Sequence, residues 1–323
     1  MKKTVSWGII GTGSIANLFA QDIAYTKHCR LQAVASRTPE KTKAFASQYN
    51  VPAAYSSYEK LANDPAVDAV YVATPHPFHL ENTLTAINAG KAVLCEKPFA
   101  MDAKQARTMI EAAAKKGVFL MEGMWTRFLR AAIRLREWLD DKRIGEVLSL
   151  QADFCIAFGA GPKHRINNPD LGGGALLDLG IYAVSFASMV FGTQPAKILA
   201  AAHNGKTGVD DQDAIIFQYE NGATAMLSCS SRHWIVPQGR IAGTTGSIVI
   251  PPKFYSPAKL IFQPETKPEK TYDFPYHGYG LAYEADHVAS CLMDKKLHSD
   301  IMPLEETLAI METMDKIKKA TRR

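Results

Sequence analysis

The sequence has few cysteines, and they are scattered. Only five occur in 323 residues, and none is spaced as C-x-x-C. We therefore expect neither a disulfide framework nor a zinc-binding cysteine cluster, and we predict no metal site. This cysteine usage is typical of proteins in a reducing compartment, and we expect the protein to be cytoplasmic.

The sequence also lacks a strong excess of one charge and a long unbroken apolar run. Lys plus Arg number 37 and Asp plus Glu 32, and basic residues cluster only at Lys318, Lys319, Arg322 and Arg323. Nucleic-acid-binding proteins usually concentrate positive charge on one face, so we expect no nucleic-acid partner. The uncharged stretch 179–196 is interrupted by glycine, serine and proline. We interpret it as a buried core helix and expect no membrane partner.

What the first part of the sequence does contain is a regular alternation of strand and helix patterns. Short apolar runs, with helical segments between most of them, lie at 5–10, 31–36, 67–73, 92–95 and 119–121. Continuously apolar strands are typical of a parallel sheet that is covered on both faces. Residues 1–122 are therefore predicted to form a doubly wound α/β domain of the Rossmann type, which binds a dinucleotide.

After residue 122 the strands follow one another largely without intervening helices. Residues 214–219 and 223–230 flank Asn221-Gly222, a hairpin signal because these residue types adopt positive φ angles. Successive strands of this kind favour a largely antiparallel sheet. We expect residues 123–323 to form an α+β domain with an open sheet, and two domains are the usual outcome at this length.

A glycine-rich turn follows the first predicted strand. The segment G-T-G-S-I-A at 11–16 fits G-x-G-x-x-G/A directly before a predicted helix. Gly11 permits the tight turn, and Gly13 lets the backbone approach a pyrophosphate. The helix N-terminus then offers free N–H groups and a positive dipole end to the phosphates. We assign dinucleotide binding to Gly11, Thr12, Gly13, Ser14 and Ile15.

The end of the second predicted strand bears on the choice between NAD and NADP. It reads Ala35-Ser36-Arg37-Thr38, without the carboxylate that usually holds the ribose 2′-hydroxyl of NAD. Arg37 could instead hold a 2′-phosphate through charge-assisted hydrogen bonds, with Ser36 beside it. NADP is therefore favoured over NAD. The alternative is that Arg37 is a solvated loop residue.

Two further segments place polar residues where parallel strands end. A-T-P-H-P-F-H at 73–79 and C-E-K-P at 95–98 follow apolar runs, at the sheet edge where such folds bind ligands. Spacing alone leaves Lys97 open as a site residue or as a surface residue that ends a strand. The i, i+3 spacing of the two histidines could suit a metal, but no further ligand accompanies them. On their position we assign to the cofactor site Thr74, His76, His79, Glu96 and Lys97.

These motifs, with G-G-G-A-L-L-D-L-G-I-Y at 172–182, resemble the glucose–fructose oxidoreductase/inositol dehydrogenase (Gfo/Idh/MocA) family. The resemblance spans nearly the whole chain. It implies that Lys97 is the catalytic or substrate-orienting lysine and that Pro98 is preceded by a cis peptide bond. Most members have D-x-G-x-H, with both polar residues in the active site, whereas this chain has Asp178 and Tyr182.

That tyrosine, together with M-W-T-R-F at 124–128, is similar to the branch that contains dimeric dihydrodiol dehydrogenase and NADP-dependent D-xylose dehydrogenases. The resemblance implies that Tyr182 is the acid/base and Lys97 its partner. It also implies that Asp178 belongs to the active site. The substrate pocket would be lined by Trp125, Phe154 and His79.

Two arginines near this motif have a simpler interpretation. Arg127 and Arg130 are expected on the solvated face of a helix.

Elementary electrostatics supports pairing Tyr182 with a lysine. A free tyrosine has a pKa of about 10, so a phenolate working near pH 7 needs about 4 kcal/mol of stabilisation. An ammonium about 4 Å away supplies roughly 4 kcal/mol at an effective dielectric near 20. Asp178 lies four residues before Tyr182, so a helix would place both on one face. The alternatives are a packed core tyrosine and, for Asp178, a charge at a helix start.

The sequence thus predicts an NADP-dependent oxidoreductase that moves a hydride between nicotinamide and a CH–OH carbon of a sugar or cyclic diol. A keto-sugar reductase and an inositol-type dehydrogenase stay open as alternatives. A non-catalytic NADP-sensing regulatory protein is the alternative from another class, and the presence of both Lys97 and Tyr182 argues against it. Relatives use the open sheet to dimerise, so the resemblance implies a homodimer or higher homo-oligomer.

Overall fold

The computed structural model describes residues 4–159 and 161–321, and the chain divides into two compact units. The first unit is Met1–Phe128 with Tyr276–Leu308, and the second is Leu129–Pro275 with Ala309–Arg323. The sequence analysis expected a single boundary, after residue 122. The division in the structure differs because the chain returns to the first unit after Pro275. Two residues of the basic C-terminal cluster, Arg322 and Arg323, lie outside the described residues.

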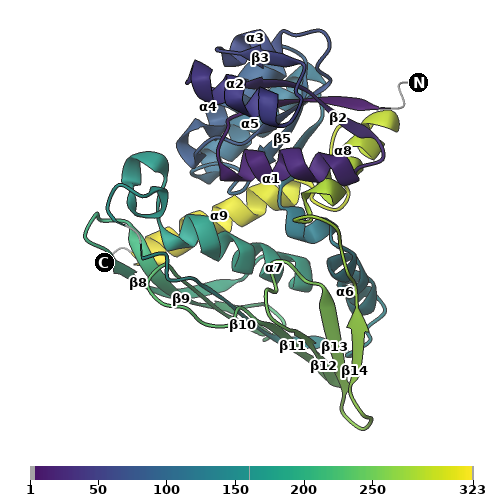
Figure 1. Ribbon diagram of the computed structural model, residues 1–323. Helices are drawn as coiled ribbons and strands as arrows, with labels where there is room; N and C mark the ends of the chain where they lie inside the picture. Colours follow the sequence, from purple (N-terminus) through teal and green to yellow (C-terminus); the bar gives the residue numbers. More distant parts are fainter. Residues whose placement is uncertain (1–3, 160, 322–323) are drawn as a thin grey trace. The chain divides into compact units, whose positions relative to one another are not determined.

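The first unit is built on a six-stranded parallel sheet in the order β3-β2-β1-β4-β5-β6, with its helices packed around it (Figure 1). Strands β1, β4, β5 and β6 are buried along their whole length, as parallel strands between helical layers are. The predicted doubly wound sheet is confirmed. Its strands are β1 (Val5–Ile10), β2 (Cys29–Ala35), β3 (Ala53–Tyr55), β4 (Ala69–Val72), β5 (Ala92–Glu96) and β6 (Leu120–Gly123).

The helices of this unit have local causes that can be read in the sequence. In α5 the Asp102 carboxylate caps the start by accepting the N–H of Gln105 at 2.8 Å, and Gly117 ends the helix at a φ of 67°. Of the regular elements, β3 and α3 were not predicted, because three and five residues are too short to show a period. The helices are α1 (Ser14–Asp22), α2 (Pro39–Gln48), α3 (Tyr58–Ala62), α4 (His79–Asn88), α5 (Ala103–Lys116) and α8 (Leu281–Met293).

The segment 276–308 is attached to the rest of the first unit by hydrogen bonds to a buried carboxylate and to the backbone. The Asp22 carboxylate accepts the N–H groups of Tyr279 and Leu281 just before and at the start of α8. After α8, the carbonyl of Leu297 accepts the N–H of Leu120 at 3.1 Å. These bonds explain why a segment so late in the chain completes the cofactor-type domain.

The second unit contains an eight-stranded sheet in the order β14-β13-β12-β11-β7-β10-β9-β8. Only the pair β7–β10 is parallel among these described strands, so the predicted largely antiparallel sheet is confirmed. Strand β8 was not predicted because its alanines and polar residues give no apolar alternation. The strands are β7 (Val147–Cys155), β8 (Lys197–Asn204), β9 (Asp210–Gln218), β10 (Thr224–Ser230), β11 (Gly239–Gly243), β12 (Gly246–Ile250), β13 (Lys259–Pro264) and β14 (Lys270–Asp273).

One face of this sheet is covered by helices. Helix α7 (Ile181–Phe191) packs on β7 and β10, and α6 (Arg130–Asp140) packs on β13 (Figure 1). The helical segment Pro169–Phe191 is, within the described residues, the one long and apolar enough to cross a membrane, and 83% of its most apolar window is buried. This confirms the predicted buried core helix. Helix α9 (Leu304–Thr321) contains the third division between the units, at Leu308.

The hairpin between β9 and β10 is confirmed, with one correction to its turn. Gly222 has a φ of 83°, whereas Asn221 is not in the positive-φ region. The Asn221 side chain instead accepts the N–H of Ala223 at 3.1 Å. One residue with positive φ is therefore sufficient in this turn, because the amide side chain satisfies the next backbone donor.

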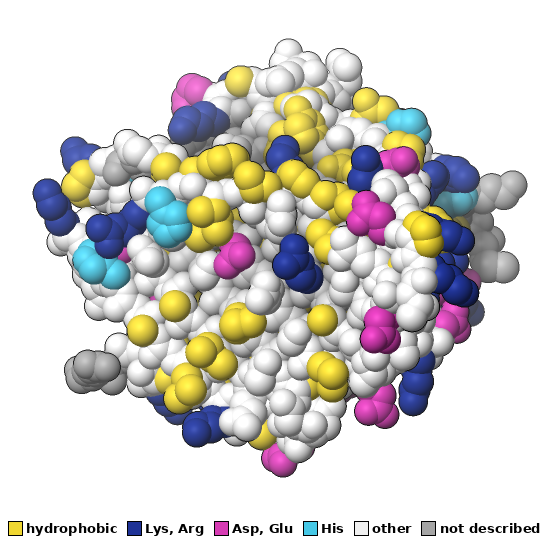
Figure 2. Space-filling model, turned by 90° about the horizontal axis from the view of Figure 1, so that it is seen from below, with side chains coloured by type: hydrophobic (Ala, Val, Ile, Leu, Met, Phe, Trp, Pro, Cys, Tyr) yellow, Lys and Arg dark blue, Asp and Glu magenta, His cyan; other side chains and the backbone are white. Residues whose placement is uncertain are grey.

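The other face of the eight-stranded sheet carries a row of exposed apolar side chains. Leu199, Ile216 and Met226 are in register on β8, β9 and β10 and are 54%, 45% and 43% exposed. Figure 2, which views the molecule from below, shows hydrophobic side chains spread over a broad face, with many of the charged side chains toward its margin. Exposed apolar groups arranged in this way indicate an interaction surface.

Candidate active site

The glycine-rich turn forms a backbone cradle at the carboxyl end of β1. Gly11 has a φ of 113°, and a Cβ atom there would lie 2.6 Å from the carbonyl oxygen of Ala73. At Gly13 a Cβ would meet open space, and no side chain caps the start of α1 at this residue. The cradle therefore fits a pyrophosphate, since the space above Gly13 is open and the first N–H groups of α1 are not capped.

The two polar residues at the end of β2 differ in their surroundings. The Ser36 hydroxyl is buried and bonds to the Thr38 carbonyl at 3.0 Å and to the Thr42 hydroxyl at 2.7 Å. Arg37 is exposed, and its guanidinium carbon lies 5.0 Å from the centre of the Phe78 ring. A guanidinium resting on an aromatic face is held in place while its donors still face solvent.

His79 braces two loops that follow neighbouring strands. Its Nδ1 lies 2.9 Å from the carbonyl oxygen of Pro98 and its Nε2 2.9 Å from that of Thr74. Burial lowers the pKa of the His79 imidazole, and the nearby Lys97 charge acts in the same direction, although its carbonyl contacts oppose this. Both ring nitrogens thus face main-chain carbonyls of the unit, and the neutral imidazole donates its one N–H to one of them. The structure gives His79 a bracing role, and its predicted contacts with cofactor and substrate stay predictions.

Lys97 lies just after β5 in a turn held by buried carboxylates. The Lys97–Pro98 peptide bond is cis, as the resemblance implies. The Glu96 carboxylate accepts the phenol of Tyr71 and, at 3.0 Å, the N–H of Lys97. Glu122, at the end of β6, accepts the N–H of Phe99 at 3.2 Å. The turn that presents Lys97 is therefore fixed on both sides by side chains of its own sheet.

Glu122 is fully buried, and its environment changes its ionisation. Burial raises the pKa of the Glu122 carboxyl to about 7, although the charge of Arg127 and the N–H of Phe99 partly oppose this. A carboxyl with such a pKa carries its proton over much of the acidic and neutral range. The segment after Pro98 is thus supported at Phe99 by an acid that is mainly protonated below about pH 7 and mainly ionised above it.

The expected solvated position of Arg127 is wrong. Its side chain is buried in the 3₁₀ turn Trp125–Phe128, and its two terminal nitrogens bond to the two carboxylate oxygens of Glu306 at 2.8 and 2.7 Å. A buried guanidinium needs such a bidentate partner to offset the loss of hydration. Arg130 is exposed, as expected. Trp125, at the start of the same turn, is half-buried.

In the second unit two of the predicted substrate residues, Phe154 and Tyr182, lie in an aromatic cluster. The rings of Phe154 on β7 and Tyr182 on α7 are 5.4 Å apart in an edge-to-face arrangement. Tyr255, in the loop after β12, stacks on Phe154 at 3.9 Å and lies 5.7 Å from Tyr182. Edge-to-face and stacked contacts fix the orientation of such rings. The Tyr182 ring is therefore held on two sides.

Asp178 lies one helical turn before Tyr182 and has a charged partner. A guanidinium nitrogen of Arg165 donates to its carboxylate at 2.9 Å, and the Asp178 side chain is 5% exposed. Arg165 thus adds to the predicted pair of Asp178 and Tyr182 a positive charge that the sequence analysis did not predict.

Three residues of this arrangement were missed by sequence reasoning. Tyr255 and Arg165 come from loops whose sequences show no period, and only the fold brings them to α7. Glu122 has a usable signal, because a carboxylate directly after the apolar residues of β6 is unusual unless it serves a purpose. Within residues 4–159 and 161–321, no group of three or more His, Cys, Asp and Glu side chains could hold a metal ion.

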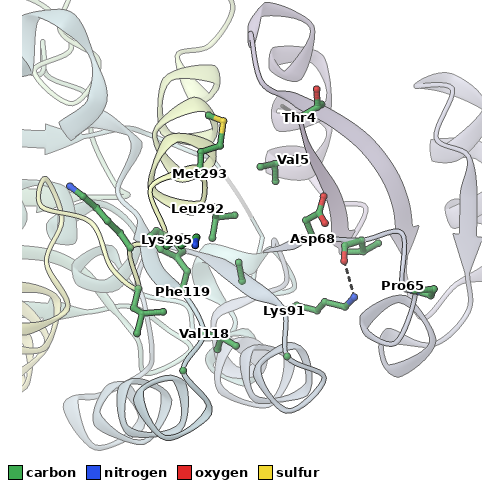
Figure 3. A pocket seen from close by; sticks show the side chains of 16 residues that line it. Thr4, Val5, Pro65, Asp68, Lys91, Val118, Phe119, Leu292, Met293 and Lys295 are labelled. Atoms are coloured by element: carbon green, nitrogen blue, oxygen red, sulfur yellow. Dashed lines mark hydrogen bonds between the residues drawn. The ribbon is translucent and has the colours of Figure 1, made fainter. Parts of the chain in front are cut away.

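A pocket of about 630 Å³ lies elsewhere in the first unit (Figure 3). It is lined by residues at the amino-terminal ends of the parallel strands, among them Val5, Asp68 and Phe119. The Lys91 ammonium at its edge donates to the carbonyls of Asp64 and Val67 at 2.7 Å each. Ligands of this architecture bind at the opposite, carboxyl ends of the strands. We therefore assign the candidate active site to the strand ends that carry Gly11 and Lys97.

Comparison with known proteins agrees with both halves of this description. The sequence model described as an oxidoreductase family with an NAD-binding Rossmann fold matches residues 5–124, and the GFO/IDH/MocA C-terminal domain matches residues 132–249. The chain belongs to the Gfo/Idh/MocA family. The predicted resemblance is confirmed, and the protein is an NAD(P)-dependent oxidoreductase.

Individual relatives of this family member cover almost its whole length. It is 40% identical over 320 residues to a trans-1,2-dihydrobenzene-1,2-diol dehydrogenase of Xenopus laevis, with 96% of each chain covered. An aldose-aldose oxidoreductase of Caulobacter crescentus, solved with glycerol, superposes with a TM-score of 0.91 at 28% identity and covers 99% of this chain and 98% of its own. A 3-ketoreductase of Actinomadura kijaniata, solved with NADP and TDP-benzene, superposes with a TM-score of 0.86 at 26% identity and the same coverage.

Proposed function

We propose that the protein is an NADP-dependent oxidoreductase that transfers a hydride between nicotinamide and a CH–OH carbon of a sugar or cyclic diol. The relatives that act on a dihydrodiol and on aldoses support this substrate class. The observation that carries the proposal is the shared sheet edge of the first unit, where the Gly11–Gly13 cradle and the braced Lys97 turn both follow parallel strands.

The cofactor would be held by backbone groups and strand-end side chains of the first unit. When bound, the nicotinamide supplies the hydride acceptor or donor. The first N–H groups of α1 would bind the pyrophosphate, because no side chain caps this helix start and the space at Gly13 is open. The residues proposed to contact the cofactor are Gly11, Thr12, Gly13, Ser14, Ile15, Ser36, Arg37, Thr74, His76, His79, Glu96 and Lys97.

The preference for NADP is proposed to come from Arg37. No carboxylate stands at positions 35–38 at the end of β2. The exposed Arg37 guanidinium, seated on Phe78, presents donors that suit a 2′-phosphate and would find no equivalent partner in NAD.

The proton transfer is proposed to belong to Tyr182. During oxidation its phenolate would take the substrate hydroxyl proton as the carbon loses its hydride, and during reduction its phenol would return that proton. Lys97 would stabilise the phenolate and orient the hydroxyl. Trp125 and Phe154 would line the pocket for the carbon skeleton, and Asp178 would fix the substrate or Tyr182 by hydrogen bonding.

Turnover with a substrate panel tests this proposal. The purified chain is mixed with NADP or NAD and a panel of aldoses, polyols and cyclic trans-diols, and the absorbance of the reduced nicotinamide is followed. Oxidation of at least one class with a higher kcat/KM for NADP than for NAD is expected. Absence of turnover with either cofactor, also in the reductive direction with keto-sugars, would contradict it.

A homodimer through the open face of the eight-stranded sheet is also proposed, with the cytoplasm as its location. The row Leu199, Ile216 and Met226 supports the dimer, because two copies packed face to face would cover it. Light scattering should give twice the chain mass of 35.4 kDa. Ile216→Asp should weaken association by about tenfold or more, whereas Leu297→Asp, at a similarly exposed leucine of the first unit, should not. A monomeric wild type would contradict the dimer.

A further inference from the structure

The second unit contains its own cation beside the proposed acid/base. The Arg165 guanidinium is 2.9 Å from the Asp178 carboxylate, one helical turn before Tyr182. Burial opposes the charge of Arg165, but the hydrogen bond and charge of Asp178 and the interaction with Tyr182 hold the pKa of the guanidinium above its ordinary value. The interaction is reciprocal, so the cation at Arg165 favours the phenolate form of Tyr182.

The glycine loop before α7 is shaped to seat this arginine. A Cβ atom on Gly173 would lie 2.8 Å from the carbonyl oxygen of Arg165 and 2.7 Å from that of Ile166, closer than real Cβ atoms approach. The N–H of Gly174 donates to the Ile166 carbonyl at 2.9 Å. Two of the three glycines of the loop thus hold the Arg165 segment directly against the start of the helix that carries Asp178 and Tyr182.

We infer that Arg165 is a positioning residue for the proposed reaction: through Asp178 it fixes the π-helical turn 176–180 that leads into α7, and its charge sets the pH at which Tyr182 can accept a proton. This inference rests on the proposed function, because it assigns Arg165 to the same proton transfer. It adds a cation of the second unit to the lysine that the family resemblance implies.

The sign of the effect follows from the charges near Tyr182. The proposed partner Lys97 is unchanged in every variant of this test. Within the second unit Arg165 contributes a positive charge and Asp178 a negative one, and the neighbouring rings of Phe154 and Tyr255 contribute none while neutral. With both ionised groups present their effects largely cancel. Removing Arg165 alone leaves an uncompensated carboxylate near the phenolate, whereas removing Asp178 alone leaves an uncompensated cation.

The test is the pH profile of kcat in the oxidative direction, with the best substrate of the panel. Arg165→Met should move the rising limb to higher pH by about one unit and lower kcat at neutral pH by about tenfold. Asp178→Asn should move the limb to lower pH, and the double variant should return it toward the wild-type position. Arg165→Lys, which keeps the charge, should restore most of the wild-type profile.

A neighbouring charge serves as the matched control. Lys163 is exposed and two residues before Arg165, so Lys163→Met removes one positive charge from the same loop and should leave the limb in place. If the rising limb of the pH profile does not move in Arg165→Met, the inference is overturned, whatever the value of kcat. A rise in KM without a change in the profile would also overturn it, because it would indicate that Arg165 binds the substrate directly. If Arg165→Met does not fold, Asp178→Asn decides instead, because a limb that fails to move to lower pH in that variant overturns the inference. If the wild-type protein shows no turnover, the proposed function itself is contradicted. Failure of the proposed function can therefore be told apart from failure of the inference about Arg165.

Discussion

In the first unit Lys97 is held by backbone groups and buried carboxylates, whereas in the second unit Tyr182 is held by aromatic rings and next to an ion pair. The turn at Lys97 is fixed by Glu96, Glu122 and His79, each of which bonds to main-chain atoms. Around Tyr182 the neighbours are the rings of Phe154 and Tyr255, with Asp178 and its arginine one turn away.

This difference shows how each unit would tolerate change. Backbone hydrogen bonds to a buried side chain fix a loop strongly, and their loss leaves buried donors without partners. Ring contacts and a partly exposed ion pair fix orientation with less energy per contact. We therefore expect substitutions around Lys97 to affect both stability and turnover, and substitutions around Tyr182 to act mainly on turnover.

The largest effect is expected at Lys97. Lys97→Met should lower kcat by about 10³-fold or more, because the cation proposed to stabilise the phenolate and orient the hydroxyl is lost. Binding of NADP, measured by quenching of tryptophan fluorescence, should stay within about threefold of wild type, since the glycine turn is unchanged. Lys104→Met, at an exposed lysine of α5, is the matched control and should be fully active. Equal activity of Lys97→Met would remove Lys97 from the mechanism.

The next effect is a pH dependence of stability from Glu122. Its pKa rises from an ordinary 4.5 to about 7 on folding, so between these values the folded state keeps a proton that the unfolded state releases. The free energy of unfolding of the wild type therefore falls as pH rises through this window. Glutamine does not ionise, so the Glu122→Gln variant should not lose stability in this window. Its free energy of unfolding relative to wild type should therefore rise by up to about 3 kcal/mol between pH 4.5 and a pH above 7.

Thermal unfolding of Glu122→Gln and wild type at several pH values checks this expectation. Glu111→Gln, at an exposed glutamate of α5, should differ from wild type by the same amount at every pH. A stability difference for Glu122→Gln that is independent of pH would show that Glu122 ionises normally in the folded protein.

A smaller effect is expected at Arg37, an exposed side chain that rests on the Phe78 ring. Arg37→Met should weaken NADP binding by about 10- to 100-fold, the free energy of a charge-assisted hydrogen bond to phosphate. Binding of NAD should change little, so the ratio of the two dissociation constants is the measurement. Lys43→Met, at an exposed lysine of α2, should leave that ratio unchanged. Equal losses for NAD and NADP would show that Arg37 does not contact the 2′-phosphate.

The same contrast between the units explains what could be predicted from the sequence. The first sheet, its glycine turn and the strand-end motif at Lys97 follow from local patterns, because parallel strands bring their carboxyl ends to one edge. The helix that carries Asp178 and Tyr182 also follows from its apolar run. Arg165 and Tyr255 could not be predicted, since loops without periodicity bring them to the helix only in the folded chain. Arg127 was misplaced because its partner Glu306 is 179 residues away.

Tyr182→Phe is the most direct test of the proposal that the first unit binds the cofactor and Tyr182 of the second unit transfers the proton. This substitution removes only the phenolic oxygen and keeps the ring that packs on Phe154. We predict that kcat with NADP and the best sugar or diol substrate falls by about 10³-fold, while the dissociation constant of NADP stays within about twofold of wild type. A Tyr182→Phe variant with wild-type kcat would contradict the assignment of the proton transfer to the second unit.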